Sequence, residues 1–180
     1  MTQISFAPFP VLTTKRLILR QPEAGDAQEV FALRSDGEIN RYLGRQPAAS
    51  TDDAMNFIKA VNENTEANAS LYWAITFRDS NKLIGTICLF GFSGEYDRCE
   101  IGYELSTGFQ GQGIMKEALE KVIDYAFRTL GVGRIEGSVH KDNESSIRLL
   151  EKLSFRDAGE PDAAVPELVN YYLLRADGKA

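Results

Sequence analysis

A glycine-rich turn between a strand-like and a helix-like segment limits most strongly what this chain can fold into. Residues 98–106 (RCEIGYELS) alternate like a strand, and glycines follow at positions 108, 111 and 113. Apolar residues then recur every four positions, as in a helix, at Ile114, Ala118, Val122 and Ala126. Glycines at a helix start let an anion approach unpaired N–H groups at the positive end of the helix dipole. The turn therefore predicts a site for a pyrophosphate or a similar anion, or a tight turn that binds nothing.

The remaining pattern predicts a mixed α/β fold. A chain of 180 residues is close to the usual size of one domain, ~150 residues, and we expect a single domain over residues 1–180. Early strands follow one another as hairpins, and later strands alternate with helices, which predicts a mixed, mostly antiparallel sheet with helices on both faces. Strands are expected at 13–21, 71–78, 82–90, 98–106, 133–140, from Phe155 and at 166–176, and helices at 23–35, 50–66, from Gly113 and at 143–153.

Charge and composition exclude several classes of protein. Lys and Arg total 20 against 26 Asp and Glu, so the net charge of −6 argues against nucleic-acid binding and favours a cationic substrate. No apolar run reaches the ~18 residues of a membrane span, and the N-terminus shows no basic-then-apolar signal pattern, which predicts a cytoplasmic protein away from membranes. One histidine and two separated cysteines offer no recognisable metal site.

The spacing of the glycines argues against two familiar phosphate-binding motifs. Dinucleotide-binding folds use GxGxxG after their first strand, whereas this chain has GxxGxG late in the sequence. The GxxxxGK[ST] loop of nucleoside-triphosphate-binding proteins is absent. A nucleotide-dependent dehydrogenase is thus disfavoured.

The turn resembles the acetyl-CoA loop of the GNAT acetyltransferases, which reads [Gln/Arg]-x-x-Gly-x-[Gly/Ala]. The matching residues are Gln110, Gly111, Gln112, Gly113, Ile114 and Met115. Met115 stands where the family has a small residue, but only its backbone N–H is needed. The resemblance implies the GNAT fold, with acetyl-CoA as the donor bound by these residues and an amine as the acceptor.

A second run extends the resemblance. Residues 143–155 (NESSIRLLEKLSF) are similar to N-x-x-S-x-x-[V/L]-L-E-K-x-G-F of the Rim-type branch, which acetylates ribosomal-protein N-termini, although Ser154 replaces the usual glycine. The segments TKRLILRQ and EIGYELS are similar to the same branch. The resemblance implies that Asn143 contacts the CoA arm. Asn143 is equally a good helix N-cap, and the two roles can coexist.

Two residues are candidates for catalysis. By strand alternation Glu100 shares a face with Glu104 just before the anion turn, which suits a general base, or else a solvated strand face. Ser146 falls in the first turn of a helix and would serve the CoA thiol, unless it is an ordinary first-turn hydroxyl. The strand is expected to offer a backbone N–H near Leu105 to polarise the thioester carbonyl.

Other polar residues are expected to be structural. Tyr103 faces away from Glu100 and suits the core, His140 suits a polar rim, and Cys88 and Cys99 suit buried thiols. One of Tyr171 and Tyr172 should face inward and is a weaker candidate for a proton donor. The loop carrying Arg41, Tyr42 and Arg45 could close over the acceptor, but it is expected to be solvated.

The favoured function is transfer of an acetyl group from acetyl-CoA to a protein or peptide N-terminal α-amine, by a monomer or homodimer without metal. An α-amine has a pKa near 8 and a lysine near 10.4, so the α-amine loses its proton more readily. Loop 39–48 and residues 159–162 would flank the acceptor groove. The alternatives are a small free amine as acceptor and a non-catalytic acyl-CoA-binding module.

Overall fold

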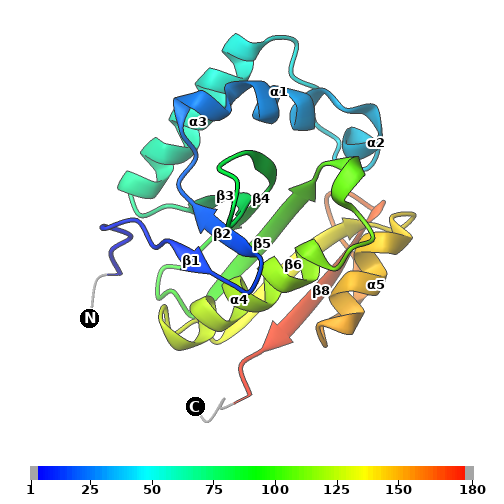
Figure 1. Cartoon of the computed structure of the whole chain (residues 1–180). Coiled ribbons are helices and arrows are strands. Elements are labelled where there is room, and N and C mark those ends of the chain that lie inside the picture. The colour runs from blue at the N-terminus through cyan, green and yellow to red at the C-terminus, as the bar shows by residue number, and fades with distance from the viewer. Residues whose placement is uncertain (1–3, 177–180) are drawn as a thin grey trace.

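A computed structural model describes residues 4–176, which form one eight-stranded sheet with helices on both faces (Figure 1). The strand order is β1-β2-β3-β4-β5-β6-β8-β7. The strands are β1 (Leu12–Thr13), β2 (Leu17–Arg20), β3 (Leu71–Phe77), β4 (Leu83–Phe90), β5 (Arg98–Leu105), β6 (Arg134–His140), β7 (Arg156–Pro161) and β8 (Leu168–Leu174). The helices are α1 (Ala27–Ser35), α2 (Gly37–Asn40), α3 (Thr51–Glu66), α4 (Ile114–Arg128) and α5 (Glu144–Lys152), with 3₁₀ turns at Ala24–Asp26 and Thr107–Phe109.

The predicted mixed α/β architecture is confirmed. Every neighbouring pair of strands is antiparallel except β5 and β6, which are parallel because helix α4 carries the chain back between them. Helix α3 begins after Ser50, whose side chain accepts a hydrogen bond from the Asp53 N–H. The strand expected over residues 13–21 is wrong in one respect: the chain turns at Thr14, whose hydroxyl accepts from the Leu17 N–H, and β1 pairs back on β2.

Two hydrophobic cores lie on opposite faces of the sheet. Strand alternation sends Trp73 and Ile75 into the larger core, under α4 and α5, and sends Ala74 into the smaller core, under α1 and α3. Met55 of α3 is 42% exposed and lies outside both cores. The helices therefore divide by face: α1 and α3 cover one side, and α4 and α5 cover the other (Figure 1).

The two parallel strands separate along their length. β5 and β6 pair only from Arg98↔Arg134 to Glu100↔Glu136, whereas β5 continues to Leu105 and β6 to His140. On their outer sides, β5 stays paired with β4 over most of its length, and β6 stays paired with β8 over all of its length. We call this gap the fork; its closed end lies at Glu100 and Glu136. Its open end lies where β5 leads into the glycine turn and β6 leads into α5.

Candidate active site at the fork

The glycine turn has the backbone conformation that its sequence predicts. Gly111 and Gly113 have φ of 75° and 73°, in the left-handed region that other residues adopt at a cost. Gly113 is the N-cap of α4 and makes no side-chain cap. A Cβ at Gly111 would meet no atom within 4 Å, so the space beside the turn is open. Within residues 4–176 no amide from Gly111 to Lys116 donates a backbone hydrogen bond.

Contacts from β1 and β2 hold the turn from behind. Glu117, in the first turn of α4, accepts hydrogen bonds from the Thr14 hydroxyl (2.6 Å) and from the Arg16 N–H (2.8 Å) and Nε (2.6 Å). These hydrogen bonds, together with the Arg16 charge, lower the pKa of Glu117 although burial opposes the change. The Arg16 guanidinium also donates to the Gln112 carbonyl at 3.1 Å. The free amides are therefore fixed in place before any ligand arrives.

Side chains of the turn point away from the open space. Ile114 and Met115 are 1% and 7% exposed and belong to the core, so only their N–H groups can contact a ligand. This explains why Met115 is tolerated where the GNAT loop usually has a small residue. Gln110 Nε2 donates to the Leu105 carbonyl at 2.9 Å and ties the turn to the end of β5.

Helix α5 begins at the other side of the open end. Asn143 is its N-cap, and the side-chain oxygen accepts from the Ser146 N–H at 3.3 Å and from the Ser145 hydroxyl at 3.2 Å. The capping role of Asn143 is thus confirmed. Its contact with CoA remains a prediction.

Tyr103 and Ser146 face each other across the fork. The Tyr103 hydroxyl is the only fully buried side-chain nitrogen or oxygen without a hydrogen-bond partner in residues 4–176. Burial raises the pKa of Tyr103, and the nearby Ser146 side chain lowers it in part. The expectation that Tyr103 is a plain core residue misses this pairing. Alternation along β5 places the Tyr103 ring on the α5 side. The sequence therefore predicts the side to which this ring points, but not that Ser146 is its neighbour.

Glu100 lies at the closed end of the fork, on the face opposite Tyr103. It forms no ion pair or side-chain hydrogen bond with any residue from 4 to 176. Burial and the neighbouring Glu136 and Asp162 raise its pKa, while Arg98 works against them. A Cβ at Gly91 would lie 2.8 Å from Glu100 Oε1, so glycine there leaves room for the carboxylate. A free carboxylate with a raised pKa suits a proton acceptor.

Glu104, on the same face, is occupied by two arginines. Arg45 contacts both carboxylate oxygens, at 2.6 and 3.3 Å, and Arg34 lies 4.0 Å away. The Thr86 hydroxyl also donates to it at 3.5 Å. Of the two carboxylates on this face, Glu100 is therefore the one available for chemistry.

A short loop segment crosses the open end of the fork, and the expectation that it is simply solvated is wrong. Arg45 reaches Glu104 at the end of β5, and the Tyr42 ring packs on His140 at the end of β6 with centroids 5.2 Å apart. Arg41 lies over the Tyr42 ring at 5.3 Å. We call residues 41–45 the bridging segment. His140 is thus a partner of this segment and not merely a rim residue.

The remaining candidates lie outside the fork. Tyr171 is 5% exposed and is the inward-facing member of its pair, as predicted, but Asp157 and Glu151 are the charges near its hydroxyl. Cys88 and Cys99 are free, and burial raises the pKa of each to about 12, so both stay protonated and inert at neutral pH. Among residues 4–176 no cluster of potential metal ligands occurs, and no helix is long and apolar enough to cross a membrane.

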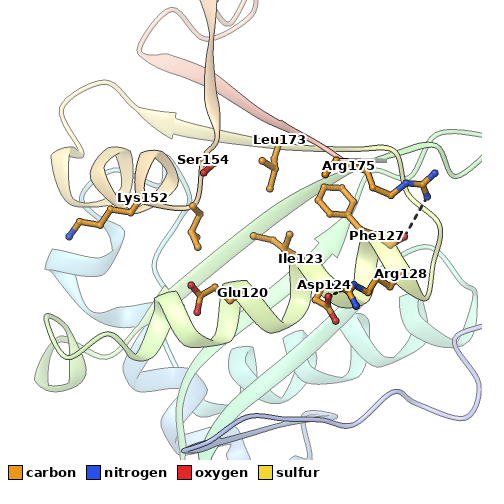
Figure 2. A pocket seen from close by; sticks show the side chains of 11 residues that line it. Glu120, Ile123, Asp124, Phe127, Arg128, Lys152, Ser154, Leu173 and Arg175 are labelled. Atoms are coloured by element: carbon orange, nitrogen blue, oxygen red, sulfur yellow. Dashed lines mark hydrogen bonds and ion pairs between the residues drawn. The ribbon is translucent and has the colours of Figure 1, made fainter. Parts of the chain in front are cut away.

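An open groove of about 700 Å³ lies away from the fork. Figure 2 shows it between α4, α5 and the end of β8, with Ile123, Phe127 and Leu173 in its wall. Arg175 closes one end by donating to the Phe127 carbonyl. The groove uses the second half of α4, so it lies at the opposite end of that helix from the glycine turn.

Comparison with known proteins agrees with this geometry. Residues 16–156 match the family described as Acetyltransferase (GNAT) domain. The uncharacterized N-acetyltransferase YoaA of Bacillus subtilis is 38% identical over 84% of this chain and 85% of its own length. More distant relatives are the [ribosomal protein uS5]-alanine N-acetyltransferase of Escherichia coli (27%; 82% and 79%) and the spermidine N(1)-acetyltransferase of Vibrio cholerae (24%; 80% and 81%).

The fold also matches solved structures. RimL, the ribosomal L7/L12 α-N-protein acetyltransferase in complex with coenzyme A, superposes with a TM-score of 0.82 at 18% identity, over 92% of this chain and 98% of that one. The chain therefore belongs to the GNAT family, and it is an acetyl-CoA-dependent N-acetyltransferase. The free amides beside Gly111 and the unpartnered Tyr103 hydroxyl fit such a ligand, because they leave hydrogen-bonding groups for it to satisfy.

Proposed function

We propose that the chain transfers the acetyl group of acetyl-CoA to the N-terminal α-amine of a protein or peptide, with the reaction at the closed end of the fork. The observation that carries the proposal is the position of Glu100 at the closed end of the fork. It is a carboxylate without an ion pair, and it lies on the face of β5 opposite to Tyr103 and Ser146. The donor enters from the α4 and α5 side, and the amine enters from the face that carries Glu100.

The donor is held along the open end. The amides of residues 111–115 bind the pyrophosphate, helped by the dipole of α4. Gln110 and Gln112 shape the turn through their hydrogen bonds to Leu105 and Gly108. Asn143 contacts the arm of CoA, and the thioester lies between the separated strands. The unpaired edge of β5 offers backbone N–H groups to the donor: the one near Leu105 meets the CoA arm, and the thioester carbonyl lies further in, toward Glu100, because about 16 Å of strand separates the two residues.

The chemistry then needs little from the chain. The neutral amine attacks the carbonyl carbon, and the C–S bond breaks with its electron pair moving to sulfur. Glu100 takes the amine proton, directly or through a water, and the Ser146 hydroxyl faces the departing thiolate. Holding both reactants in line supplies much of the rate enhancement, because a bimolecular encounter becomes a local step.

The acceptor assignment is supported by charge as well as by relatives. The net charge of the chain is −6 and Glu100 itself carries no ion pair, so a cationic ammonium group is attracted to it. The E. coli relative named above acetylates a ribosomal protein, and the bridging segment and residues 159–162 would flank an extended peptide. The V. cholerae relative makes spermidine the competing acceptor.

Glu100→Gln tests the base. Turnover should fall by about 10²-fold while CoA affinity stays unchanged. In the parent, turnover should rise as pH increases through the raised pKa of Glu100. In the variant, this rise of turnover with pH should be absent. Because ionised Glu100 is disfavoured by its surroundings, the variant should be as stable as the parent at pH 7 or more so. Full activity of Glu100→Gln from pH 6 to 9 would assign the proton to solvent.

Competition between acceptors tests the substrate. Short peptides with free and with acetylated N-termini, each containing a lysine, should be offered beside spermidine and single amino acids. We expect the free N-terminal peptides to be acetylated fastest, with rates that fall as salt screens the net negative charge of the chain. Preference for spermidine, or equal rates on the blocked peptides, would overturn the α-amine assignment and leave the acetyltransferase intact.

A further inference from the structure

Two hydroxyl groups on opposite walls of the fork both lack hydrogen-bond partners. The Tyr103 hydroxyl is fully buried and unpaired. Ser146 Oγ lies near enough to Tyr103 to lower its pKa in part, but it forms no well-aligned hydrogen bond with any residue from 4 to 176. Leaving a buried hydroxyl unpaired costs about 1–3 kcal/mol, so the Tyr103 hydroxyl, with the half-buried Ser146 beside it, calls for an explanation.

The packing between β5 and α5 sets these hydroxyls opposite each other. Near the closed end Ile101 and Leu150 both lie 3.7 Å from a Cβ placed at Gly137, so they face each other there. Tyr103 is two residues further along the same face of β5, toward the open end. Ser146 is four residues before Leu150, on the same face of α5 and also toward the open end. Tyr103 and Ser146 therefore form the next layer of the same contact.

We propose that Tyr103 is a positioning residue for the leaving thiolate: when CoA is bound, its hydroxyl donates to Ser146 Oγ, which turns the Ser146 proton toward the CoA sulfur in the fork. A serine hydroxyl donates once and accepts twice, so it can receive from Tyr103 and still donate to sulfur. No proton is transferred in this step. The sulfur keeps the electron pair of the broken C–S bond and is stabilised as a thiolate by the hydrogen bond from Ser146.

The properties of Tyr103 suit a constant donor. Burial keeps its phenol protonated through the range in which an amine acetyltransferase works, so it does not switch off as pH rises. A tyrosine ring has only two side-chain torsions and is held here in the larger core, whereas a free serine hydroxyl samples several orientations. The inference rests on the placement of the thioester in the fork given under the proposed function.

The test compares Tyr103→Phe, Ser146→Ala and the double variant with Tyr125→Phe as a matched control. Tyr125 is a half-buried tyrosine of α4 that packs on Trp73, away from the fork. Tyr103→Phe should lower kcat about tenfold with CoA affinity unchanged, and Ser146→Ala should lower it at least as much. In the Ser146→Ala background the tyrosine change should have no further effect. Tyr125→Phe should keep the parent kcat.

Two further measurements exclude a merely structural role. The pKa of the enzyme-bound CoA thiol, followed by the ultraviolet absorption of the thiolate, should be lower in the parent and in Ser146→Thr than in Tyr103→Phe and Ser146→Ala. Thermal unfolding of Tyr103→Phe should match or exceed that of the parent, because the variant removes an unpaired buried oxygen. Lower activity together with undiminished stability is the expected signature.

Several outcomes would overturn the inference, and they separate it from the proposed function. Unchanged kcat and thiol pKa in Tyr103→Phe, beside a slow Ser146→Ala, would remove Tyr103 and keep Ser146. Weaker CoA binding at unchanged kcat would make Tyr103 a cofactor contact. Parent-like kcat in Ser146→Ala would place the thioester elsewhere, and the proposed placement would fail as well.

Discussion

Helices α4 and α5 begin at the same end of the sheet, and their first turns use their backbone N–H groups in different ways. At α4 the N-cap is Gly113, which has no side chain, and the amides around it make no backbone hydrogen bond within residues 4–176. At α5 the N-cap is Asn143, whose side chain already accepts from Ser146.

The comparison shows how one fold keeps one helix end open and closes another. An uncapped helix end lowers stability. At α4 this loss is offset by the three hydrogen bonds that Glu117 receives from Thr14 and Arg16, which we call the clamp. At α5 the stabilisation comes from the cap itself. The open end therefore suits a pyrophosphate and the capped end suits a neutral part of the same ligand.

The largest effect is expected from filling the open end. Gly113→Val puts a branched side chain at φ 73°, which strains the turn out of the conformation that exposes the amides, so CoA affinity should fall at least tenfold, about 1.4 kcal/mol. Gly108→Val is the matched control, because Gly108 has no positive φ and open space around it. Calorimetric titration measures affinity, and thermal unfolding reports whether each variant is folded. Parent-like affinity in folded Gly113→Val would break the comparison.

A smaller effect is expected from weakening the clamp. Glu117→Gln should lower the free energy of unfolding by about 1–2 kcal/mol at pH 7, because charge-assisted hydrogen bonds become neutral ones. Glu117 has a lowered pKa in the folded chain, so its contribution is complete above the unfolded pKa of about 4.3 and is lost as pH falls through the folded value. Denaturant unfolding from pH 7 to pH 3 should show the variant and parent converging. A constant difference would mean that the charge of Glu117 is irrelevant.

The capped end should respond more mildly, and two substitutions separate its two roles. Asn143→Ala should lower the free energy of unfolding by about 1 kcal/mol through loss of the cap. Asn143→Asp keeps the cap and should keep the stability, but its charge beside an anionic ligand should weaken CoA binding about threefold, more so at low salt. If Asn143→Asp binds CoA like the parent at every salt concentration, Asn143 is a cap alone.

The sequence predicts local features of this fold well because periodicity and capping are local. The helix from Thr51 to Glu66, the cap at Asn143 and the glycine-to-helix turn were all readable. The turn at Thr14 was missed because apolar alternation continues across it, and only the pairing of β1 with β2 reveals it. Alternation along β5 also assigned Glu100 and Tyr103 to opposite faces.

Contacts between distant parts of the chain could not be predicted in this way. Arg45 and Glu104 are 59 residues apart, and no local pattern links a loop arginine to a strand carboxylate. The same holds for the Tyr42 and His140 rings, and for Tyr103 beside Ser146. Glu100 stood out as one of two acids on a strand face, but the sequence could not tell that Glu104 is neutralised and Glu100 is not.

The bridging segment has a consequence for how this enzyme can diversify. It contacts the ends of both separated strands through Arg45 and Tyr42, yet it belongs to neither the glycine turn nor α5. We expect exchanges in residues 41–45 to change which amines are accepted without altering how tightly CoA is held. CoA binding and acceptor selection then depend on different residues. After gene duplication, a few substitutions in this one loop can therefore change the substrate while CoA binding is kept.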